Sequence, residues 1–223
     1  MTAKPSIASE VTQQLRDAIL RGQIAPNAKL RLEELGANFG VSLSPIREAL
    51  LRLSGEGFVV SEDQRGFRVA AASAQNLAEV TALRSLLEPY ALRLSIEAGD
   101  VKWEEGLIAI SHRLTRIEQQ NGFVPFLDEW ERAHRDFHIA LVAGCGMPML
   151  LQFCSMLHDQ SDRYRRLYLQ KRPPQRNVAM EHAGIVEAVL AHDADTACAR
   201  LLEHSQQTGA AVLAFINELD PKE

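Results

Sequence analysis

The first seventy residues alternate between short stretches in which apolar residues have helical spacing and short turn-like segments. The first predicted helix begins at Ser9, a competent N-cap, and ends at Arg21, because Gly22 follows as a terminator. Its inner face consists of Val11, Leu15, Ala18 and Ile19. We expect this helix to support the two helices that follow it.

A second and a third helix are predicted on either side of a short turn. Residues 32–39 place three apolar side chains on one helix face, and Gly40 stands where a helix can end in a left-handed residue. The third helix is expected to begin at Ser44 to Pro45. Ser42 and Ser44 are both competent N-caps, and Pro45 suits the first helical position because its missing N–H costs nothing there.

The third helix is amphipathic, and two β-prone runs follow it. Its apolar face consists of Ile46, Ala49, Leu50 and Leu53. Packing of this face leaves Arg47 pointing outward. The runs Phe58–Val60 and Phe67–Val69 flank a polar segment, residues 61–66, which suits a hairpin or wing.

Two short helices around a turn form the sequence pattern of a helix-turn-helix, whose second helix places its N-terminal residues against base edges in the major groove. We therefore predict a winged helix-turn-helix that binds DNA; the alternative is that any small helical domain can show such spacing. Arg31 lies where it can reach a phosphate, with a solvated surface arginine as the alternative. The residues assigned to DNA contact are Arg31, Ser42, Ser44, Pro45, Arg47, Arg52, Arg65 and Gly66.

Most of residues 9–70 resembles the winged-helix reader of GntR-type bacterial repressors, in their FadR-like branch. The resemblance is carried by the run LEELGANFGVSLSPIREALLRLSGEGFV, which extends from Leu32 to Val59. The family usually carries a basic residue after Gly-Val-Ser, where this chain has Leu43. A base or phosphate contact common in the family is therefore expected to be absent, and the family's operator sequences are not carried over.

The rest of the chain is predicted to be helical. Small residues at 70–75 mark the boundary between a DNA-binding domain, residues 1–72, and a second domain, residues 73–223. The predicted helices of the second domain span residues 75–98, 101–120, 123–143, 147–171, 175–192 and 194–219, separated by glycine, proline or His192-Asp193. Short connections favour an antiparallel bundle of six to seven helices, so the fold class is mainly α.

The composition supports two folded domains, and the excess of acidic residues lies outside the predicted DNA-binding domain. The chain has 223 residues, of which 46% are hydrophobic. Residues 1–70 hold nine basic and eight acidic residues, a net charge of +1, and residues 71–223 hold fifteen and twenty-one, a net charge of -6. An isoelectric point near 5.8 argues against a protein that coats nucleic acid indiscriminately but permits a site-specific dimer.

Targeting signals and cysteine chemistry are not indicated. The first ten residues lack an apolar signal-peptide core, and no apolar run is long enough to span a bilayer, so we expect a cytoplasmic protein with no membrane partner. Cys145, Cys154 and Cys198 are widely spaced and lack a C-x-x-C motif. They are interpreted as small core residues rather than as disulfides or thiolate metal ligands.

Histidines provide the candidate chemistry of the second domain. His134 and His138 are four residues apart, so both rings project from one helix face at a spacing that suits a shared metal. Two unrelated histidines are the alternative. His182 begins one helix and His204 falls late in the next, and the chain reverses between them at His192-Asp193. In an antiparallel pair these two rings are level, and all four can converge in the bundle core.

Residues 75–208 resemble the FCD ligand-binding domain of FadR-like regulators. The matching patterns are F-H before A-x-G-C-G, E-H-x-x-I-x-x-A, and D-x-x-x-A-x-x-L-x-x-H. The resemblance implies that His138, His182 and His204 are metal ligands, and it places His134 where metal-binding members often carry Asp. Four neutral imidazoles would leave a divalent charge uncompensated, which favours an anionic effector. The expected ion is zinc, with nickel or another transition metal as alternatives; a metal-free, vestigial site is the remaining possibility.

Three further side chains are assigned to the effector. Arg84 occupies an apolar position in the stripe formed by Leu77, Val80, Leu87, Ala91, Leu94 and Ala98. A charge in a helix seam needs a partner, which is either Glu88, four residues on, or the carboxylate of an effector. Arg163 and Tyr164, together with Arg165, are candidates to line the cavity, although we expect at least two of these three on the surface. The effector assignments are Arg84, Arg163 and Tyr164.

These features favour a metabolite-responsive transcription regulator, expected to be a repressor. A homodimer would bind operator DNA with two-fold symmetry, and a small organic acid at the metal would change operator affinity. The sequence of the second domain, especially residues 134–146 and 157–167, is most similar to the CsiR-type branch, which responds to glutarate-like dicarboxylates. The alternatives are a metal-dependent hydrolase-like enzyme, disfavoured because no general base such as that of H-E-x-x-H is evident, and a DNA-binding protein without an effector.

Overall fold

The computed structural model describes residues 5–62, 66–119, 126–172 and 176–219. The chain divides into two compact units, Met1–Ala72 and Ser73–Glu223, and each is described by itself. Within the described ranges, no helix combines the length and the apolar composition needed to cross a membrane.

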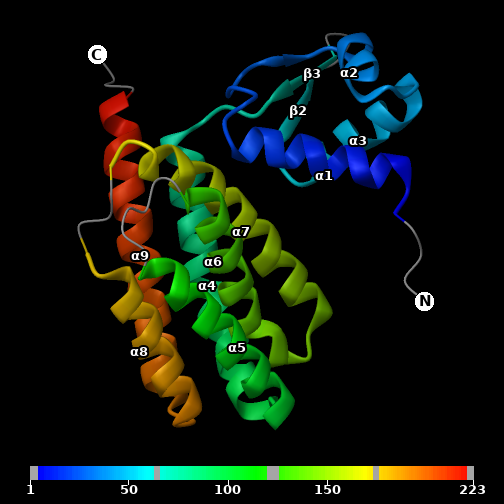
Figure 1. Ribbon diagram of the computed structural model, residues 1–223. Coiled ribbons are helices and arrows are strands. Elements are labelled where there is room, and N and C mark those ends of the chain that lie inside the picture. The colour runs from blue at the N-terminus through cyan, green and yellow to red at the C-terminus, as the bar shows by residue number, and fades with distance from the viewer. Residues whose placement is uncertain (1–4, 63–65, 120–125, 173–175, 220–223) are drawn as a thin grey trace. The chain divides into compact units, whose positions relative to one another are not determined.

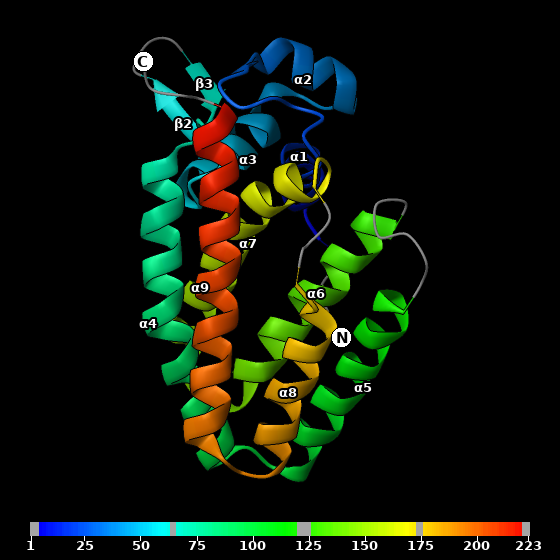
Figure 2. The same ribbon diagram turned by 90° about the vertical axis from the view of Figure 1, so that its left-hand side faces the viewer.

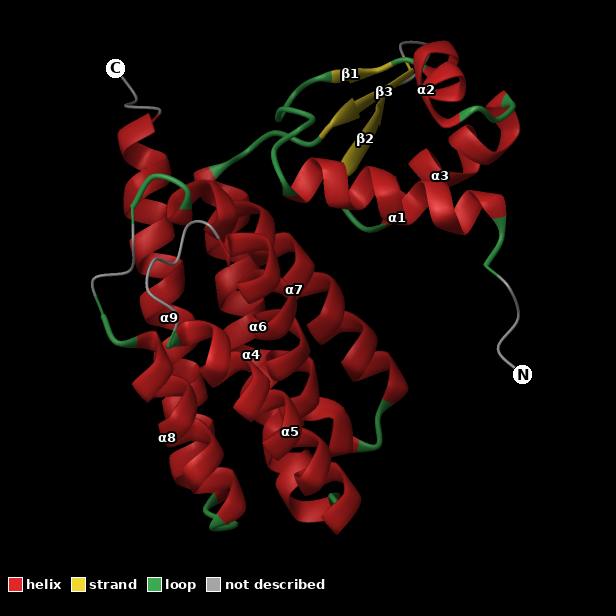
Figure 3. Ribbon diagram, in the orientation of Figure 1, coloured by secondary structure: helices red, strands yellow, loops and turns green. Residues whose placement is uncertain are grey.

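The first unit combines three helices with a small antiparallel sheet (Figure 3). Its elements are α1 (Ile7–Leu20), β1 (Lys29–Leu30), α2 (Leu32–Phe39), α3 (Leu43–Gly55), β2 (Val59–Glu62) and β3 (Gly66–Val69). The strand order is β1-β3-β2, with Val59 opposite Val69 and Lys29 opposite Arg68. The predicted wing is confirmed as the β2–β3 pair, and the short strand β1, which was not predicted, extends it.

Two helix starts differ from the sequence prediction. The N-cap of α1 is Ser6, whose hydroxyl accepts a hydrogen bond from the backbone N–H of Ser9. Ser9 therefore lies in the first turn rather than at the cap. The α3 helix begins one residue early, at Leu43, after an extended Ser42. Pro45 is still tolerated because the first-turn N–H groups of a helix have no intrahelical acceptor.

The core of the first unit forms where the apolar periodicity predicted it. Ile46, Ala49, Leu50 and Leu53 of α3 are completely buried and pack with the inner face of α1. Gly40 ends α2 with a left-handed backbone, at φ of 65°, a conformation that glycine adopts without a steric penalty. This turn connects α2 to α3.

The second unit is a bundle in which long helices run side by side (Figures 1 and 2). Its described helices are α4 (Ala74–Ala98), α5 (Val101–Glu118), α6 (Leu127–Val142), a 3-10 turn η2 (Ala143–Cys145), α7 (Pro148–Leu169), α8 (Val178–Leu190) and α9 (Ala194–Leu219). The α4 and α9 helices pack along each other, and α8 packs against α9. The predicted mainly α fold is confirmed; the predicted separators at 121–122 and 173–174 lie outside the described residues.

The apolar stripe predicted along α4 is confirmed in part. Leu77, Val80 and Ala91 are buried, whereas Leu87 and Leu94 are half-buried against the core and Ala98 is exposed. A strict seven-residue spacing drifts by about 20° per heptad on a straight helix, so its last members rotate out of the interface. Other α4 side chains take those positions, namely Glu88, Leu92, Ser95 and Ile96.

All three cysteines are buried and have free thiols. Burial raises the pKa of Cys154 to about 12, which keeps this thiol protonated and unreactive at neutral pH. The structure therefore uses Cys145, Cys154 and Cys198 as small interior residues, as the sequence predicted.

Candidate metal centre and ligand cavity

Four imidazole rings converge inside the second unit. His134 and His138 come from adjacent turns of α6, His182 from α8 and His204 from α9. One ring nitrogen of each lies within 4.8 Å of the others, and all four side chains are buried. The helical i, i+4 spacing aligns the α6 pair, while the reversal between α8 and α9 brings the other two level, with ring centroids 4.8 Å apart. The structure thus brings together the four histidines named from sequence.

Two carboxylates hold the outer nitrogens of two of these rings. The Nδ1 atom of His182 lies 2.9 Å from Oε1 of Glu118, and Nδ1 of His204 lies 2.8 Å from Oε2 of Glu181. Trp130 donates its indole N–H to the same Glu118 oxygen and stacks on His134, with ring centroids 4.4 Å apart. A carboxylate on Nδ1 places the ring proton there and leaves the Nε2 lone pair for a metal.

The electronic state of the cluster suits a cation. Burial is the main reason that the pKa of His134, His138 and His204 lies well below the ordinary value, so these rings are neutral. Among the described residues, Nε2 of His182 and Nδ1 of His134 are buried without a hydrogen-bond partner. Nitrogen lone pairs converging in a buried space fit a borderline transition metal such as zinc, nickel or copper.

The expected electrostatic balance needs correction. From the sequence, a bound divalent ion was expected to meet four neutral imidazoles and no compensating charge. In the structure, Glu118 and Glu181 each lie one hydrogen bond behind a histidine ring. These carboxylates would offset part of a divalent charge. Glu181 is shared with Arg176, whose Nη1 lies 2.7 Å from the same carboxylate, so its contribution is divided.

A cavity of about 200 Å³ borders the cluster. Its walls include two of the four histidines and two arginines; the lining residues are Trp130, His134, Arg165, Tyr168, Leu169, Arg176, Val178, His204, Thr208 and Ala211. Arg165 is buried, and its Nε and Nη2 atoms bond to Glu131 and Asp162. Its Nη1 atom is also buried and has no hydrogen-bond partner among the described residues. The cavity is therefore lined by a buried cationic side chain as well as by two of the metal-ligand candidates.

Arg84, the charged residue at an apolar position of the α4 stripe, forms an ion pair with Glu88. Its Nε and Nη2 atoms donate to the Glu88 carboxylate at 2.7 and 3.2 Å, and Nη1 donates to Ser161 Oγ at 2.9 Å. Both charged side chains are about 4% exposed. Of the two partners considered from sequence, the structure supplies Glu88, and Arg84 does not line the 200 Å³ cavity.

The expectation that at least two of Arg163, Tyr164 and Arg165 lie on the surface is wrong. All three are buried, because α7 is covered along residues 160–166 and its charges are paired within the bundle. Tyr164 accepts a hydrogen bond from Arg163 Nη2 at 2.8 Å and donates one to Asn76 Oδ1 at 2.8 Å. Neither Arg163 nor Tyr164 lines the cavity; their neighbour Arg165 does.

A fifth buried histidine adjoins the cluster and was not singled out from sequence. His158 is completely buried on α7, and its ring centroid lies 4.9 Å from that of His138. Its Nδ1 atom lies 3.4 Å from Nη2 of Arg84. One signal was available: His158, Ser161 and Arg165 recur at three- and four-residue steps, which places them on one face of α7.

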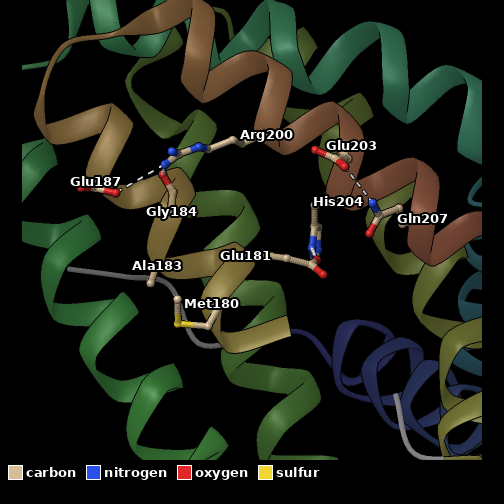
Figure 4. Close-up of a pocket in the computed structure, with 9 residues that line it drawn as sticks. All are labelled: Met180, Glu181, Ala183, Gly184, Glu187, Arg200, Glu203, His204 and Gln207. Atoms are coloured by element: carbon tan, nitrogen blue, oxygen red, sulfur yellow. Dashed lines mark hydrogen bonds and ion pairs between the residues drawn. The ribbon is translucent and has the colours of Figure 1, made fainter. Parts of the chain in front are cut away.

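A second, more open hollow of about 680 Å³ lies between α8 and α9 and is lined in part by His204 (Figure 4). Its lining includes Glu181, which reaches toward His204, and Arg200, which extends from α9 to Gly184 and Glu187 on α8. His204 lines both this hollow and the smaller cavity.

The DNA-contact candidates of the first unit lie mostly in the open. Ser42, Ser44 and Arg47 are exposed around the start of α3, and Pro45 is half-buried. The two other arginines also make ion pairs: Arg31 with Glu34 at 3.0 Å, and Arg52 with Glu48 at 2.5 Å. Gly66 is exposed at the start of β3, with φ of 90°. Arg65 lies outside the described residues.

Comparison with known proteins gives two family matches that cover the two units. Residues 7–69 match the model described as bacterial regulatory proteins, gntR family, and residues 79–207 match the FCD domain. The chain is 34% identical to the uncharacterized HTH-type transcriptional regulator BphR of Paraburkholderia xenovorans, over 94% of this chain and 86% of that protein. It is 35% identical to the HTH-type transcriptional repressor GlaR of Escherichia coli, over 85% and 88% of the two chains.

Solved structures share the fold along nearly the whole chain. E. coli McbR/YncC has a TM-score of 0.79 at 22% identity and covers 96% of this chain and 100% of its own. A putative transcriptional regulator GntR from Rhodococcus sp. RHA1 has a TM-score of 0.75 at 20% identity, with 94% and 99% covered. At these identities the likeness concerns the fold.

Proposed function

This chain belongs to the gntR family of bacterial regulatory proteins and carries an FCD domain, and on that premise we propose how it is controlled. It is a transcription regulator and not an enzyme, like the relatives it matches. In our proposal a divalent metal held by His134, His138, His182 and His204, together with a small organic acid beside it, changes the affinity of the protein for operator DNA.

The observation that carries the metal proposal is the convergence of four buried imidazoles, two of them held by carboxylates. Such carboxylate–histidine pairs orient metal ligands and raise their basicity. Zinc is the ion we propose first, with nickel or another transition metal as alternatives, because neutral imidazole suits each of them. When bound, the ion would supply a positive centre that attracts an anionic oxygen ligand.

The small cavity supports the effector proposal. His134, His204 and Arg165 all line it, and the Nη1 atom of Arg165 is buried without a hydrogen-bond partner among the described residues. An unpaired buried donor is costly, and a carboxylate would satisfy it with a charge-assisted hydrogen bond. A cavity of about 200 Å³ suits a small acid. A dicarboxylate, with one carboxylate near the metal and the other at Arg165, uses both features.

The DNA-binding part of the proposal is a homodimer on an operator with two-fold symmetry. Each winged helix would contact one half-site, so protein and operator would share the symmetry axis. The α4 helix presents Leu83, Leu86 and Tyr90 in exposed positions beside an apolar groove along α9, which suits a subunit contact. Repression is proposed from the relative named as a repressor, and a cytoplasmic location from the DNA-binding role of the gntR family.

Metal analysis of protein purified without an affinity tag tests the metal proposal. We expect about one equivalent of a divalent ion in the wild type, and none in a variant carrying His138→Ala and His182→Ala. A His112→Ala variant is the matched control, because His112 is an exposed histidine of α5 outside the cluster. Equal metal content in the wild type and the double variant would contradict the assigned site.

Operator binding tests the effector proposal separately. Succinate, glutarate and adipate would be added to the metal-loaded protein while its binding to operator DNA is followed by fluorescence anisotropy. We expect at least one of these acids to change the dissociation constant, and to lose that effect after metal removal. Operator affinity that no acid alters would count against the sensing role and leave DNA binding intact.

A further inference from the structure

The start of α3 has a surface composition suited to reading one specific group on DNA. Ser42, Leu43 and Ser44 are all exposed there, and Arg47 is exposed one turn later. The first turn carries no acidic residue that would repel phosphates. In a helix-turn-helix, the N-terminal residues of the second helix face the base edges of the major groove. The side chain with no hydrogen-bonding group in this set is Leu43.

Leu43 is held in place on one side and open on the other. Its side chain lies against α2, because a Cβ atom added to Gly36 would come within 3.3 Å of Leu43 Cδ2. The side chain nevertheless remains 44% exposed. The neighbouring Gly36 backbone restricts the rotamers that Leu43 can adopt, so part of its side-chain entropy is already lost before DNA binds.

The chemistry of leucine restricts what it can recognise. Its side chain can neither donate nor accept a hydrogen bond, so it contributes favourable binding free energy only by covering an apolar group. In the major groove, the apolar group at a base edge is the C5-methyl of thymine; the other base edges present hydrogen-bond donors and acceptors. We propose that Leu43 reads the C5-methyl group of one thymine in each operator half-site, an inference that rests on α3 being the DNA-reading helix.

Replacement of thymine by deoxyuridine isolates this contact, because it removes the methyl group and preserves every hydrogen-bonding group of the base. Burial of one methyl group corresponds to about a fourfold change in affinity. Loss of the methyl from one half-site should therefore weaken binding about fourfold, and loss from both half-sites about fifteenfold. The position should occur symmetrically in the operator.

The experiment starts with selection of a binding sequence from random duplex DNA by the full-length wild-type dimer, without effector. Each thymine of the selected operator is then replaced by deoxyuridine, and dissociation constants are measured for the wild type and Leu43→Ala. We expect one symmetric pair of thymines whose replacement weakens the wild type and leaves the variant unaffected. Leu51→Ala is the matched control: Leu51 is exposed on α3 two turns further along, and this variant should keep the sensitivity.

The outcomes separate this inference from the proposal on metal and effector control, since neither is needed here. Equal sensitivity of Leu43→Ala and wild type at every thymine would overturn the inference, as would an operator with no methyl-sensitive thymine. Failure to enrich any sequence would overturn the DNA-reading premise and the inference with it. Circular dichroism of Leu43→Ala, expected to match the wild type, verifies that an altered response does not come from unfolding.

Discussion

The Nδ1 atom of His182 and Oε1 of Glu118 lie 2.9 Å apart, and this pair sets the chemical state of the candidate metal centre. The hydrogen bond places the ring proton on Nδ1, which leaves a lone pair on Nε2, an atom without another partner among the described residues. Glu118 comes from α5, whereas the four histidines come from α6, α8 and α9. The ring is therefore oriented by a helix that contributes no ligand.

Two substitutions at Glu118 separate charge from hydrogen bonding. Glu118→Gln keeps an oxygen acceptor for His182 but removes the negative charge, whereas Glu118→Ala removes both. We expect metal affinity to fall about tenfold in the first variant and about a hundredfold in the second, the range known for such outer partners. Competition titration with a metal chelator measures it. Unchanged affinity in Glu118→Ala would contradict the orienting role.

The buried pair Arg84–Glu88 is expected to be structural. Arg84→Met leaves the Glu88 carboxylate buried without its charged partner, so the free energy of unfolding should fall by about 3–5 kcal/mol. A double variant, Arg84→Met with Glu88→Met, removes both charges and should recover most of that loss. Urea unfolding measures both values. A double variant as unstable as the single variant would show that the ion pair is not the main contribution.

Arg165 is expected to anchor an acidic effector through Nη1. Arg165→Lys keeps a positive charge near Glu131 and Asp162 but lacks the forked donors of guanidinium. Because a hydrogen bond to a charged group contributes about 1.5–3 kcal/mol, the dissociation constant for glutarate should rise about ten- to hundredfold. Calorimetric titration of metal-loaded protein measures this. Arg163→Lys is the matched control, since Arg163 is buried on the same helix but does not line the cavity.

Tyr164 is expected to act in stability rather than in effector binding. Its hydroxyl bonds to Asn76 Oδ1 and Arg163, and the backbone N–H of Ser73, the N-cap of α4, approaches it at 3.4 Å. Tyr164→Phe leaves these polar groups without that partner, so the free energy of unfolding should fall by about 1–3 kcal/mol. Glutarate affinity should not change. A large loss of glutarate affinity in a stably folded Tyr164→Phe protein would restore the role first assigned from sequence.

The metal-free protein should lose stability as the pH falls from 7 to 5.5. Four buried histidines have a pKa well below the ordinary value of 6.5, mainly because burial disfavours the charged ring. They are His134, His138, His158 and His204. Below pH 6.5 the unfolded chain takes up protons that the folded protein does not, so each ring lowers the free energy of unfolding by up to about 1.4 kcal/mol per pH unit.

Urea midpoints of chelator-treated protein at several pH values measure this trend. Burial raises the pKa of Glu131 and of Glu181, which opposes the trend with two carboxyls against four imidazoles. The exposed-site variant His112→Ala should keep the wild-type slope, whereas His158→Gln should reduce it. A midpoint that rises between pH 7 and pH 5.5 would contradict the assignment of neutral, buried rings.

Local sequence patterns were enough to predict most of the helices and to indicate that four histidines can converge. Apolar residues at helical spacing predicted the inner face of α3, and Gly40 the end of α2, because both signals are local. The i, i+4 pair His134–His138 also needs only one helix. His182 and His204 could be placed level because a short reversal connects α8 to α9, which leaves little freedom in how the two helices pair.

The charged residues around that cluster became known only from the way the helices pack. Glu118 reaches His182 from α5, and Glu131 reaches Arg165 from α6, contacts between helices that no local spacing encodes. The same packing buried Arg163, Tyr164 and Arg165, at least two of which were expected on the surface, and it made Arg165, rather than Arg163 or Tyr164, line the cavity. Burial of a charge depends on partners supplied by other helices, so it is fixed when the helices pack.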